Sequence, residues 1–366
     1  MKLHNAYLHA QQKLVDLQLL LIVIALVIFG LIMVYDSSVI QALRDYKDGY
    51  FYIRQQLIWV GIGGVLAFFL ANINYQKLKI MSVPLIAFSL ILLIAVFIPG
   101  LGVSGGGAHR WLKLGFVTIQ PAEIIKLTSV IYLATIFEKK ARILPFIILV
   151  GLTGFVMAVL QKDLGSTIVF VLTSAIIFFI SGGSLMYFLL AIPPAVISLL
   201  VLVLTSEYRR KRILAFLDPF SDTQGFTYHI SQVLIALGSG GIFGLGLGQS
   251  RQKFEYIPEV STDSIFGVIG EELGFLGGIV LISLFVLLIF RGIKIAQQID
   301  DNFGKILALG LTAMLGIQAI VNLSSMVALL PLTGVPLPFI SYGGSALVAN
   351  LMAVGILLNI SKNIKL

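Results

Sequence analysis

Residues 244–278 read GLGLGQSRQKFEYIPEVSTDSIFGVIGEELGFLGG and lie between two long apolar runs. The stretch gathers glycines, a proline, two basic residues and five carboxylates within a chain that is otherwise mostly hydrocarbon. A polar cluster at such a place is costly unless it borders water or a substrate. We therefore expect a functional loop that runs into a helix beginning near Ile265. Asp263, at the junction of loop and helix, is the first candidate for a chemical role.

The composition indicates a polytopic membrane protein. Of the 366 residues, 58% are hydrophobic and only 11% are charged, with a mean hydropathy of +1.02. A soluble domain carries roughly twice that share of charge. The chain has no cysteine, which excludes disulfides and thiolate metal sites. The net charge of +8 suits anionic headgroups or a phosphate-bearing substrate. The basic residues are dispersed among the apolar runs, which argues against nucleic acid.

Roughly ten apolar runs approach the length of about 20 residues that a helix needs to cross a bilayer. We predict an all-α polytopic membrane protein that forms a single domain over residues 1–366. No cleavable signal peptide is apparent, because the first run is long enough to remain as an anchor. The predicted spans are residues 17–35, 55–72, 81–98, 121–137, 144–160, 164–180, 185–204, 265–290, 304–330 and 343–360.

The distribution of charge predicts the orientation of the spans. An even number of spans places both termini on the same side. The short loops on that side are richer in Lys and Arg, which predicts cytoplasmic termini. The outer loops are then residues 36–54, 99–120, 205–264 and 331–342, and the longest, 205–264, lies between the seventh and eighth spans. Every stretch of chemical interest falls on this outer face.

The loop at 99–120 and the start of the fourth span carry polar candidates. Arg110 precedes a tryptophan, and this pair suits either a substrate contact or an anchor at the membrane interface. The sequence QPAEIIK follows at 120–126. Glu123 and Lys126 are three residues apart, so they share a helix face and can pair. An ion pair within an apolar span is expensive to bury. The pair therefore forms either the polar wall of a cavity or a structural clasp between helices.

The two remaining outer loops offer further candidates. Residues 209–212, Arg-Arg-Lys-Arg, form either a headgroup anchor or a substrate contact. Residues 230–247 are apolar but interrupted by glycines, which favours a re-entrant or interfacial helix. The loop at 331–346, PLTGVPLPFISYGGSA, contains three prolines and three glycines. A rigid turn explains that composition on local grounds, and Ser341 within it is a candidate for substrate binding.

Four motifs, in this order, resemble the SEDS family (shape, elongation, division and sporulation), the polytopic peptidoglycan glycosyltransferases. They are HRWLKLG…QPAEIIK at 109–126, YRRKRILAFLDPF at 208–220, GLGQSRQKFEYIPEVSTDSIFGVIGEELG at 246–274, and PLPFISYGGSA at 336–346. With the ten spans they cover nearly the whole chain. The QSRQKFEYIPE run is more similar to the division-type branch, FtsW, than to the elongation-type branch, RodA. Ser261 and Ser264 depart from the common His and Phe, which bears on acceptor positioning and not on the reaction.

The resemblance implies polymerisation of lipid II into glycan strands for septal cell-wall synthesis. The C4 hydroxyl of an acceptor sugar attacks the anomeric carbon of a donor, and polyprenyl diphosphate leaves. The α-linked donor gives a β-linked product, so the step inverts. Such a step needs a general base near the hydroxyl, and Asp263 matches the family's essential aspartate. It also needs positive charge at the diphosphate. The basic candidates are Arg110, Lys126, Arg251 and Lys253, with Arg209 and Arg210 behind them.

Two acidic residues have alternative roles under this resemblance. Glu123 either orients Lys126 or helps to bind a divalent cation, Mg²⁺ or Mn²⁺, that bridges the diphosphate. Asp263 is the other residue that could contact such a cation, and no cofactor is required by the sequence. Asp163 either closes the cavity from the opposite wall or caps the sixth span.

Two other functions compete with polymerisation. A lipid II flippase would also need polar residues within spans, although here they cluster on one face instead of crossing the bilayer. A non-catalytic division scaffold leaves Asp263 and the Glu123–Lys126 pair without a purpose. The resemblance implies a bacterial inner-membrane location with the active site on the extracytoplasmic face. It implies as partners a class B penicillin-binding protein, which is a single-span transpeptidase, and other membrane proteins of the division or elongation complex.

Overall fold

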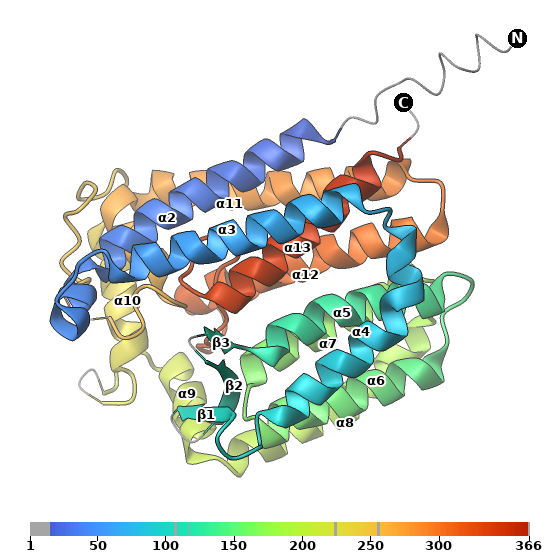
Figure 1. Cartoon of the computed structure of the whole chain (residues 1–366). Coiled ribbons are helices and arrows are strands. Elements are labelled where there is room, and N and C mark those ends of the chain that lie inside the picture. Colours follow the sequence, from blue (N-terminus) through green and yellow to red (C-terminus); the bar gives the residue numbers. More distant parts are fainter. Residues whose placement is uncertain (1–14, 106–107, 116, 223–224, 255–256, 365–366) are drawn as a thin grey trace, which may run out of the picture.

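The structure is a computed structural model that describes residues 15–105, 108–115, 117–222, 225–254 and 257–364 (Figure 1). All ten predicted spans coincide with helices in it. The helices are α2 (Leu17–Tyr46), α3 (Phe51–Asn72), α4 (Gln76–Ala95), α5 (Pro121–Phe137), α6 (Ile143–Phe155) with its π-helical end η1 (Val156–Leu160), α7 (Leu164–Ile180), α8 (Leu185–Leu204), α11 (Ile265–Gln298), α12 (Asn302–Met326) and α13 (Gly344–Ser361).

Eight of these helical segments, counting α6 with η1 as one, are long and apolar enough to cross a membrane. The other two, α5 and α7, have 17 residues each. The chain is therefore an integral membrane protein, as its composition predicts. The first helix extends to Tyr46, well beyond its predicted end, because Asp36 and Arg44 lie in the continuing helix instead of starting a loop.

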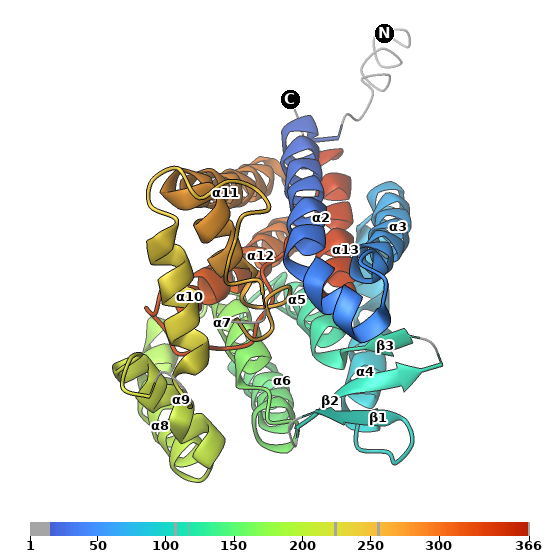
Figure 2. The ribbon, with the colours of Figure 1, turned by 90° about the vertical axis from the view of Figure 1, so that its left-hand side faces the viewer.

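The bundle has a buried centre and an apolar outside. Of the most apolar stretch of α12, 72% of the residues are buried, and the figure for α13 is 83%. The corresponding stretch of α8 has none among its described side chains, so this helix lies at the outside of the bundle. Exposed leucine, isoleucine and phenylalanine on such helices suit contact with lipid. Figure 2 shows α12 and α13 inside a ring made by the other helices.

The two ends of the bundle differ. The backbone N–H of Asp16 donates to the hydroxyl oxygen of Ser361 at 3.0 Å, so the first and last helices share one end. The loops at residues 96–120, 205–264 and 327–343 gather at the other end, on the left in Figure 1. This arrangement brings together stretches that lie far apart in the sequence.

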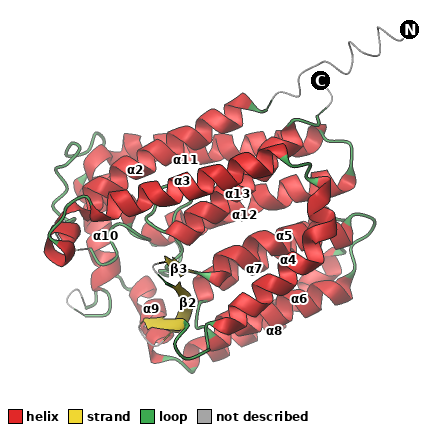
Figure 3. Ribbon diagram, viewed as in Figure 1, coloured by secondary structure: helices red, strands yellow, loops and turns green. Residues whose placement is uncertain are grey.

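The loop after α4 contains a small antiparallel sheet that the sequence does not predict. Its strands, in the order β1–β2–β3, are Gly102–Gly105, Ala108–Leu114 and Val117–Ile119. Strands of three to seven residues beside glycines carry too short an alternation to recognise. The all-α prediction holds for the spans, and this loop is the exception. Figure 3 shows the sheet at the loop-bearing end of the helices.

The long segment at 205–264 folds into two short helices and an irregular return. They are α9 (Glu207–Leu217) and α10 (Tyr228–Ser239). The second coincides with the predicted re-entrant or interfacial helix, although it ends at Ser239 instead of continuing to residue 247. The glycines that follow it adopt left-handed backbone conformations at Gly241, Gly244, Gly246 and Gly248.

Helix α11 is broken at Gly274, where φ is 67° and ψ is −165°. The interruption frees backbone groups, and the loop after α10 pairs with them. The N–H groups of Leu245 and Gly246 each donate at 3.0 Å, to the carbonyls of Glu271 and Glu272. A Cβ atom at Gly274 would lie 2.3 Å from the nitrogen of Gly244, so the contact requires glycine there.

Helices, which are red in Figure 3, make up most of the described chain. The loops, which are green, concentrate around α9, α10 and the sheet. The candidate residues from the sequence lie in or near that region. Their individual positions decide which of them can act together.

Candidate active site

A cavity of about 490 Å³ opens among the loops at the end opposite the termini. It is bordered by strand β2, the start of α7, helices α9 and α10, the loop before α11 and the loop before α13. Three of the residues predicted from the sequence line it, and they are Arg110, Asp163 and Asp263. These side chains come from three separate segments of the chain. The fold therefore assembles one polar cavity from stretches that the sequence could only treat one by one.

Asp263 lies two residues before the start of α11 and is only 7% exposed. Its carboxylate accepts a hydrogen bond from the hydroxyl of Thr262 at 3.2 Å. Its backbone carbonyl accepts one from the side-chain amide of Asn322 at 2.8 Å. Burial raises the pKa of the Asp263 carboxyl above its ordinary value, while the positive charge of Arg212 acts in the opposite direction. A carboxyl with a raised pKa is better matched to accept a proton near neutral pH.

Two arginines supply positive charge to the cavity. Arg110, on β2, donates from its guanidinium to the backbone carbonyl of Lys162 at the start of α7. Arg212, on α9, donates to the carbonyl of Leu332 at 2.8 Å and lies over the ring of Tyr208, 4.6 Å from its centroid. Among the described residues, both side chains donate to backbone carbonyls and to no carboxylate. Their charge is thus available to an anionic ligand.

Arg212 lies in the basic run at 209–212, and it was not singled out from its neighbours on the basis of the sequence. The structure distinguishes them. Arg209 is 9% exposed and donates to the carbonyls of Ala158 and Leu202, at 2.8 and 3.1 Å, so it anchors α9 to the bundle. The spacing of four residues between Tyr208 and Arg212 is the one local signal that points to the residue facing the cavity.

Asp163 combines the two roles that the sequence left open. One carboxylate oxygen caps α7 by accepting from the N–H of Ser166 at 3.1 Å. The other accepts from the side-chain amide of Gln120 at 3.2 Å, and both residues line the cavity. The cap is therefore confirmed, and a contact with substrate stays a prediction.

Glu123 and Lys126 form the predicted ion pair, with 2.8 Å between the ammonium and the carboxylate. Their side chains are 2% and 1% exposed. They do not line the cavity. Lys126 donates to the side-chain oxygen of Gln318 at 2.9 Å, and Gln318 donates to the carbonyl of Pro336 at 3.1 Å. Because Pro336 borders the cavity, the pair lies one layer behind its wall.

Lys253 also lies away from the cavity. Its ammonium is 2.8 Å from Asp36 on α2 and 3.1 Å from Glu272 on α11, and its side chain is 5% exposed. Burial acts to lower the pKa of Lys253, but the hydrogen bonds and charges of the two carboxylates raise it overall. Glu272 in turn accepts from the N–H groups of Gly248 and Ser250, at 3.0 and 2.9 Å. This clasp fixes the loop that leads to Asp263.

Arg251 and Ser341 contribute to loop structure and are not among the lining residues of the cavity. The N–H of Arg251 donates to Glu271 at 3.0 Å, and its side chain is exposed. The hydroxyl oxygen of Ser341 accepts from the N–H of Leu337 at 2.8 Å. The carbonyl of Ser341 accepts from Gln56 at 3.2 Å. A direct contact of either residue with substrate is not apparent from these positions.

Several lining residues were not anticipated from the sequence. His229, on α10, is 2.6 Å from the hydroxyl of Ser264 through its Nε2 atom. Burial lowers the pKa of His229 to about 4, so the ring is neutral at physiological pH. Tyr342 donates from its N–H to the carbonyl of Ser261 at 2.8 Å, which ties two loops together. These residues lie far apart in sequence, and no local pattern relates them.

Within the described ranges, no group of three or more His, Cys, Asp or Glu side chains could hold a metal ion. Glu123 is engaged with Lys126, and Asp263 stands with its own hydrogen bond from Thr262. Among the described residues, neither candidate carboxylate therefore stands in a cluster of three such side chains.

The family model described as "Cell cycle protein", FTSW_RODA_SPOVE, matches residues 17–366. The chain is 42% identical to the probable peptidoglycan glycosyltransferase FtsW of Trichlorobacter lovleyi, covering 96% of this chain and 94% of that protein. It is 40% identical to the stage V sporulation protein E of Bacillus subtilis, covering 95% and 97% of the two chains.

Solved structures show the same fold. A chain from a peptidoglycan synthase complex that coordinates polymerization and crosslinking superposes with a TM-score of 0.76 at 28% identity, covering 95% of this chain and 97% of that one. The rod shape determining protein RodA of Thermus thermophilus gives 0.69 at 28% identity, with 96% and 98% covered. The chain therefore belongs to the FtsW/RodA/SpoVE family of cell cycle proteins, the SEDS family that its four motifs resemble.

Proposed function

We propose that this chain is a peptidoglycan glycosyltransferase that polymerises lipid II into glycan strands by an inverting displacement with Asp263 as general base. The observation that carries the proposal is the cavity in which a buried aspartate stands among two arginines. An acceptor hydroxyl and an anionic leaving group need those two kinds of partner. The relatives named as probable peptidoglycan glycosyltransferases support the same activity.

The proposed step transfers one glycosyl unit. The acceptor's C4 oxygen bonds to the donor's anomeric carbon while the bond from that carbon to the diphosphate oxygen breaks. The hydroxyl proton passes to the Asp263 carboxylate, and polyprenyl diphosphate leaves with the bonding electron pair. Attack on the face opposite the leaving group converts an α-linked donor into a β-linked product. Asp263 acts as the base, and Arg110 and Arg212 stabilise the negative charge that develops on the diphosphate.

The other predicted residues support this step from behind the cavity wall. The Glu123–Lys126 pair fixes Pro336 through Gln318. The clasp of Lys253 fixes the loop before Asp263. We assign both clusters to positioning, because the described side chains of each are already engaged with protein partners. Asp163 stays a candidate for substrate contact, since it lines the cavity.

The decisive experiment gives the purified chain labelled lipid II and changes Asp263 to Asn. The expected result is polymer from the unchanged chain and a rate about 10²- to 10⁴-fold lower from the variant, the usual cost of losing an acid–base group. Glu259→Gln is the matched control, because this carboxylate also lines the cavity but is exposed. Near-normal polymerisation by Asp263→Asn would remove Asp263 as the base. Translocation of lipid II without polymer would identify a flippase. The absence of both polymer and translocation would identify a scaffold.

We further propose a bacterial inner-membrane location with cytoplasmic termini and an extracytoplasmic cavity. The basic bias of the loops on the terminal side supports this orientation. Cysteines at Ser221 and Lys139, exposed residues at opposite ends of the bundle, would test it in a chain that has none of its own. An impermeant thiol reagent should label the first in intact spheroplasts and the second only after lysis. The reverse pattern would invert the orientation.

We propose that the chain works beside a class B penicillin-binding protein, which cross-links the new strand, within the division or elongation complex. The similarity to a chain of a synthase complex that coordinates polymerization and crosslinking supports this partner. Co-expression with the transpeptidase from the same cell should yield a stable pair in detergent. Separation of the two under conditions that retain polymerase activity would argue against it.

A further inference from the structure

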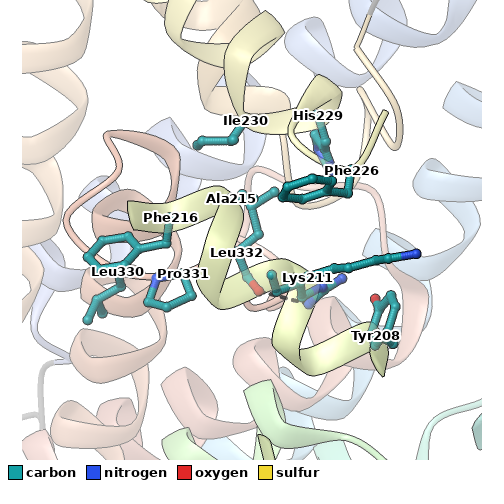
Figure 4. A pocket seen from close by; sticks show the side chains of 11 residues that line it. Tyr208, Lys211, Ala215, Phe216, Phe226, His229, Ile230, Leu330, Pro331 and Leu332 are labelled. Atoms are coloured by element: carbon teal, nitrogen blue, oxygen red, sulfur yellow. Dashed lines mark hydrogen bonds between the residues drawn. The ribbon is translucent and has the colours of Figure 1, made fainter. Parts of the chain in front are cut away.

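A second cavity, of about 290 Å³, adjoins the candidate active site. It lies between α9, the start of α10 and residues 330–332 (Figure 4). The two cavities share Tyr208, Arg212 and His229. The second cavity therefore borders the site that holds Asp263, with these three side chains at the boundary.

The lining of this second cavity changes from polar to apolar along α9. Lys211 and Arg212 lie at the end that meets the active site, one turn before Ala215 and Phe216. Leu330 and Pro331 form the wall beside Phe216. Figure 4 shows Phe216, Leu330 and Pro331 together on one side, and Lys211 and Tyr208 on the other. A ligand that fits this lining has an anionic end and a hydrocarbon end.

The two cations at the polar end can both bind an anion. Arg212 donates to a backbone carbonyl at 2.8 Å and keeps its charge without a carboxylate partner in the described hydrogen bonds. Lys211 pairs with Glu207 at 2.8 Å, but the two side chains are 51% and 69% exposed. A solvent-exposed pair of this kind is weak, so a phosphate can replace the carboxylate. Burial keeps the ring of His229 neutral, so Lys211 and Arg212 carry the positive charge at the rim.

We infer that this second cavity binds the polyprenyl diphosphate of the donor, with the diphosphate at Arg212 and Lys211 and the first isoprenoid units along Phe216 and Leu330. The inference rests on the proposed function. The donor's diphosphate is bonded directly to the anomeric carbon that is attacked beside Asp263. It must therefore lie at the edge of the active site, where the shared Arg212 stands. The acceptor's own diphosphate is separated from the attacking hydroxyl by its sugar units.

The absence of native cysteine allows a direct test by protection from labelling. Phe216→Cys places a thiol in the cavity, and Leu217→Cys places one on the next residue, which is 69% exposed and outside the lining. Farnesyl diphosphate is the soluble probe. At about ten times its Kd, it should slow maleimide labelling at position 216 about tenfold and leave position 217 unchanged. Leu330→Cys repeats the test at the neighbouring lining residue if the first variant does not fold.

Three further ligands distinguish the chemistry of the occupant. Inorganic pyrophosphate and farnesol, each lacking one half of the probe, should protect much less at equal concentration. Phosphatidylglycerol micelles should also protect less. Equal protection by phosphatidylglycerol would identify a general headgroup site and overturn the inference, as would unprotected thiols at both 216 and 330.

A charge variant tests the polar end. Arg212→Gln should weaken the protection by farnesyl diphosphate about tenfold or more, because it removes a charge-assisted contact. Arg210→Gln, an exposed residue of the same helix outside the lining, should not. Unchanged protection in Arg212→Gln would overturn the assignment of the diphosphate.

These readouts do not require turnover. A chain that makes polymer but shows no protection would contradict only this inference, and a chain that makes no polymer would contradict the proposed function.

Discussion

The side-chain amide of Asn322, on α12, donates a hydrogen bond of 2.8 Å to the backbone carbonyl of Asp263. The same amide nitrogen donates at 2.8 Å to the carbonyl of Val335. Asn322 has no solvent exposure. One buried amide thus fixes both the proposed base and the loop before α13 relative to a central helix.

Replacing Asn322 with Leu should therefore lower both stability and activity. Two buried carbonyls would lose their donor, which costs about 1–3 kcal/mol. Thermal unfolding in detergent measures the first effect and lipid II polymerisation the second. Asn72→Leu is the control, because its amide donates to Phe68 within its own helix and is exposed. A stable, fully active Asn322→Leu chain would show that this amide does not position the base.

The raised pKa of Asp263 predicts opposite changes in stability and activity. When the pKa of a carboxyl is higher in the folded than in the unfolded state, the protonated group stabilises the protein at any pH below the pKa of the unfolded state. This stabilisation is lost as the pH rises through the pKa of the folded state. Asp263→Asn should therefore unfold at a higher temperature than the unchanged chain at pH 7, while its polymerase activity falls. The difference in unfolding temperature should shrink toward pH 4, near the ordinary carboxyl pKa of about 3.9.

The same shift places the acidic limb of the polymerisation rate above the pH at which an ordinary aspartate titrates. Glu259→Gln should retain that limb, since the carboxylate is exposed. A pH profile of the Asp263→Asn residual activity that kept the same limb would assign it to another group.

The buried Glu123–Lys126 pair predicts a strong energetic coupling. Lys126→Ala should destabilise the chain by about 3–5 kcal/mol, because it leaves the carboxylate of Glu123 without its cation. The double change to Ala should cost less than the sum of the single changes. Glu207→Ala, in the exposed pair on α9, should leave the unfolding temperature unchanged. Full additivity at 123 and 126 would mean that the two residues act independently.

The contacts of Lys253 with Asp36 and Glu272 predict that substitution of Lys253 has a larger effect than substitution of its neighbour Arg251. Lys253→Met should disorder the loop before Asp263 and abolish polymerisation, because it strands the buried carboxylate of Glu272. Adding Glu272→Gln should restore part of the stability. Because the pKa of Lys253 is raised, its ammonium stabilises the fold at any pH below the ordinary lysine pKa of about 10.4. This stabilisation is lost only at higher pH. The loss in Lys253→Met should therefore be constant between pH 6 and 9.

Arg251→Gln tests the earlier interpretation that this residue contacts the diphosphate. Its side chain is exposed, and only its backbone N–H contacts Glu271. We expect an unchanged rate and an unchanged KM for lipid II. A large rise in KM without loss of stability would return Arg251 to the substrate-binding residues.

Local patterns predicted much of this molecule, and long-range contacts account for the rest. The lengths of the apolar runs predicted the positions of the ten helices. The spacing of three residues predicted the pairing of Glu123 with Lys126. Position before an apolar run predicted the cap made by Asp163. The partner of Lys253 on α2, Asp36, is 217 positions away. No local pattern reports such a contact, so the lysine looked like a free cation.

The cavity was the least predictable part for the same reason. The aspartate was found from its place at a loop–helix junction and from the family motif. Arg212 and His229 meet it only after α9 and α10 fold over the bundle. The sheet at 102–119 was missed because its strands are very short.

The break at Gly274 leaves both parts of α11 hydrogen-bonded to the loop after α10. The segment from Ile265 to Leu273 is hydrogen-bonded to the loop after α10 through the carbonyls of Glu271 and Glu272. The part from Phe275 onward is tied to the same loop, because the N–H groups of Phe275 and Leu276 donate to the carbonyls of Gly241 and Ile242 at 2.9 and 3.1 Å. The loop therefore bridges the break from both sides. A movement of the membrane-spanning part of α11 is coupled through this loop to the turn that leads to Asp263.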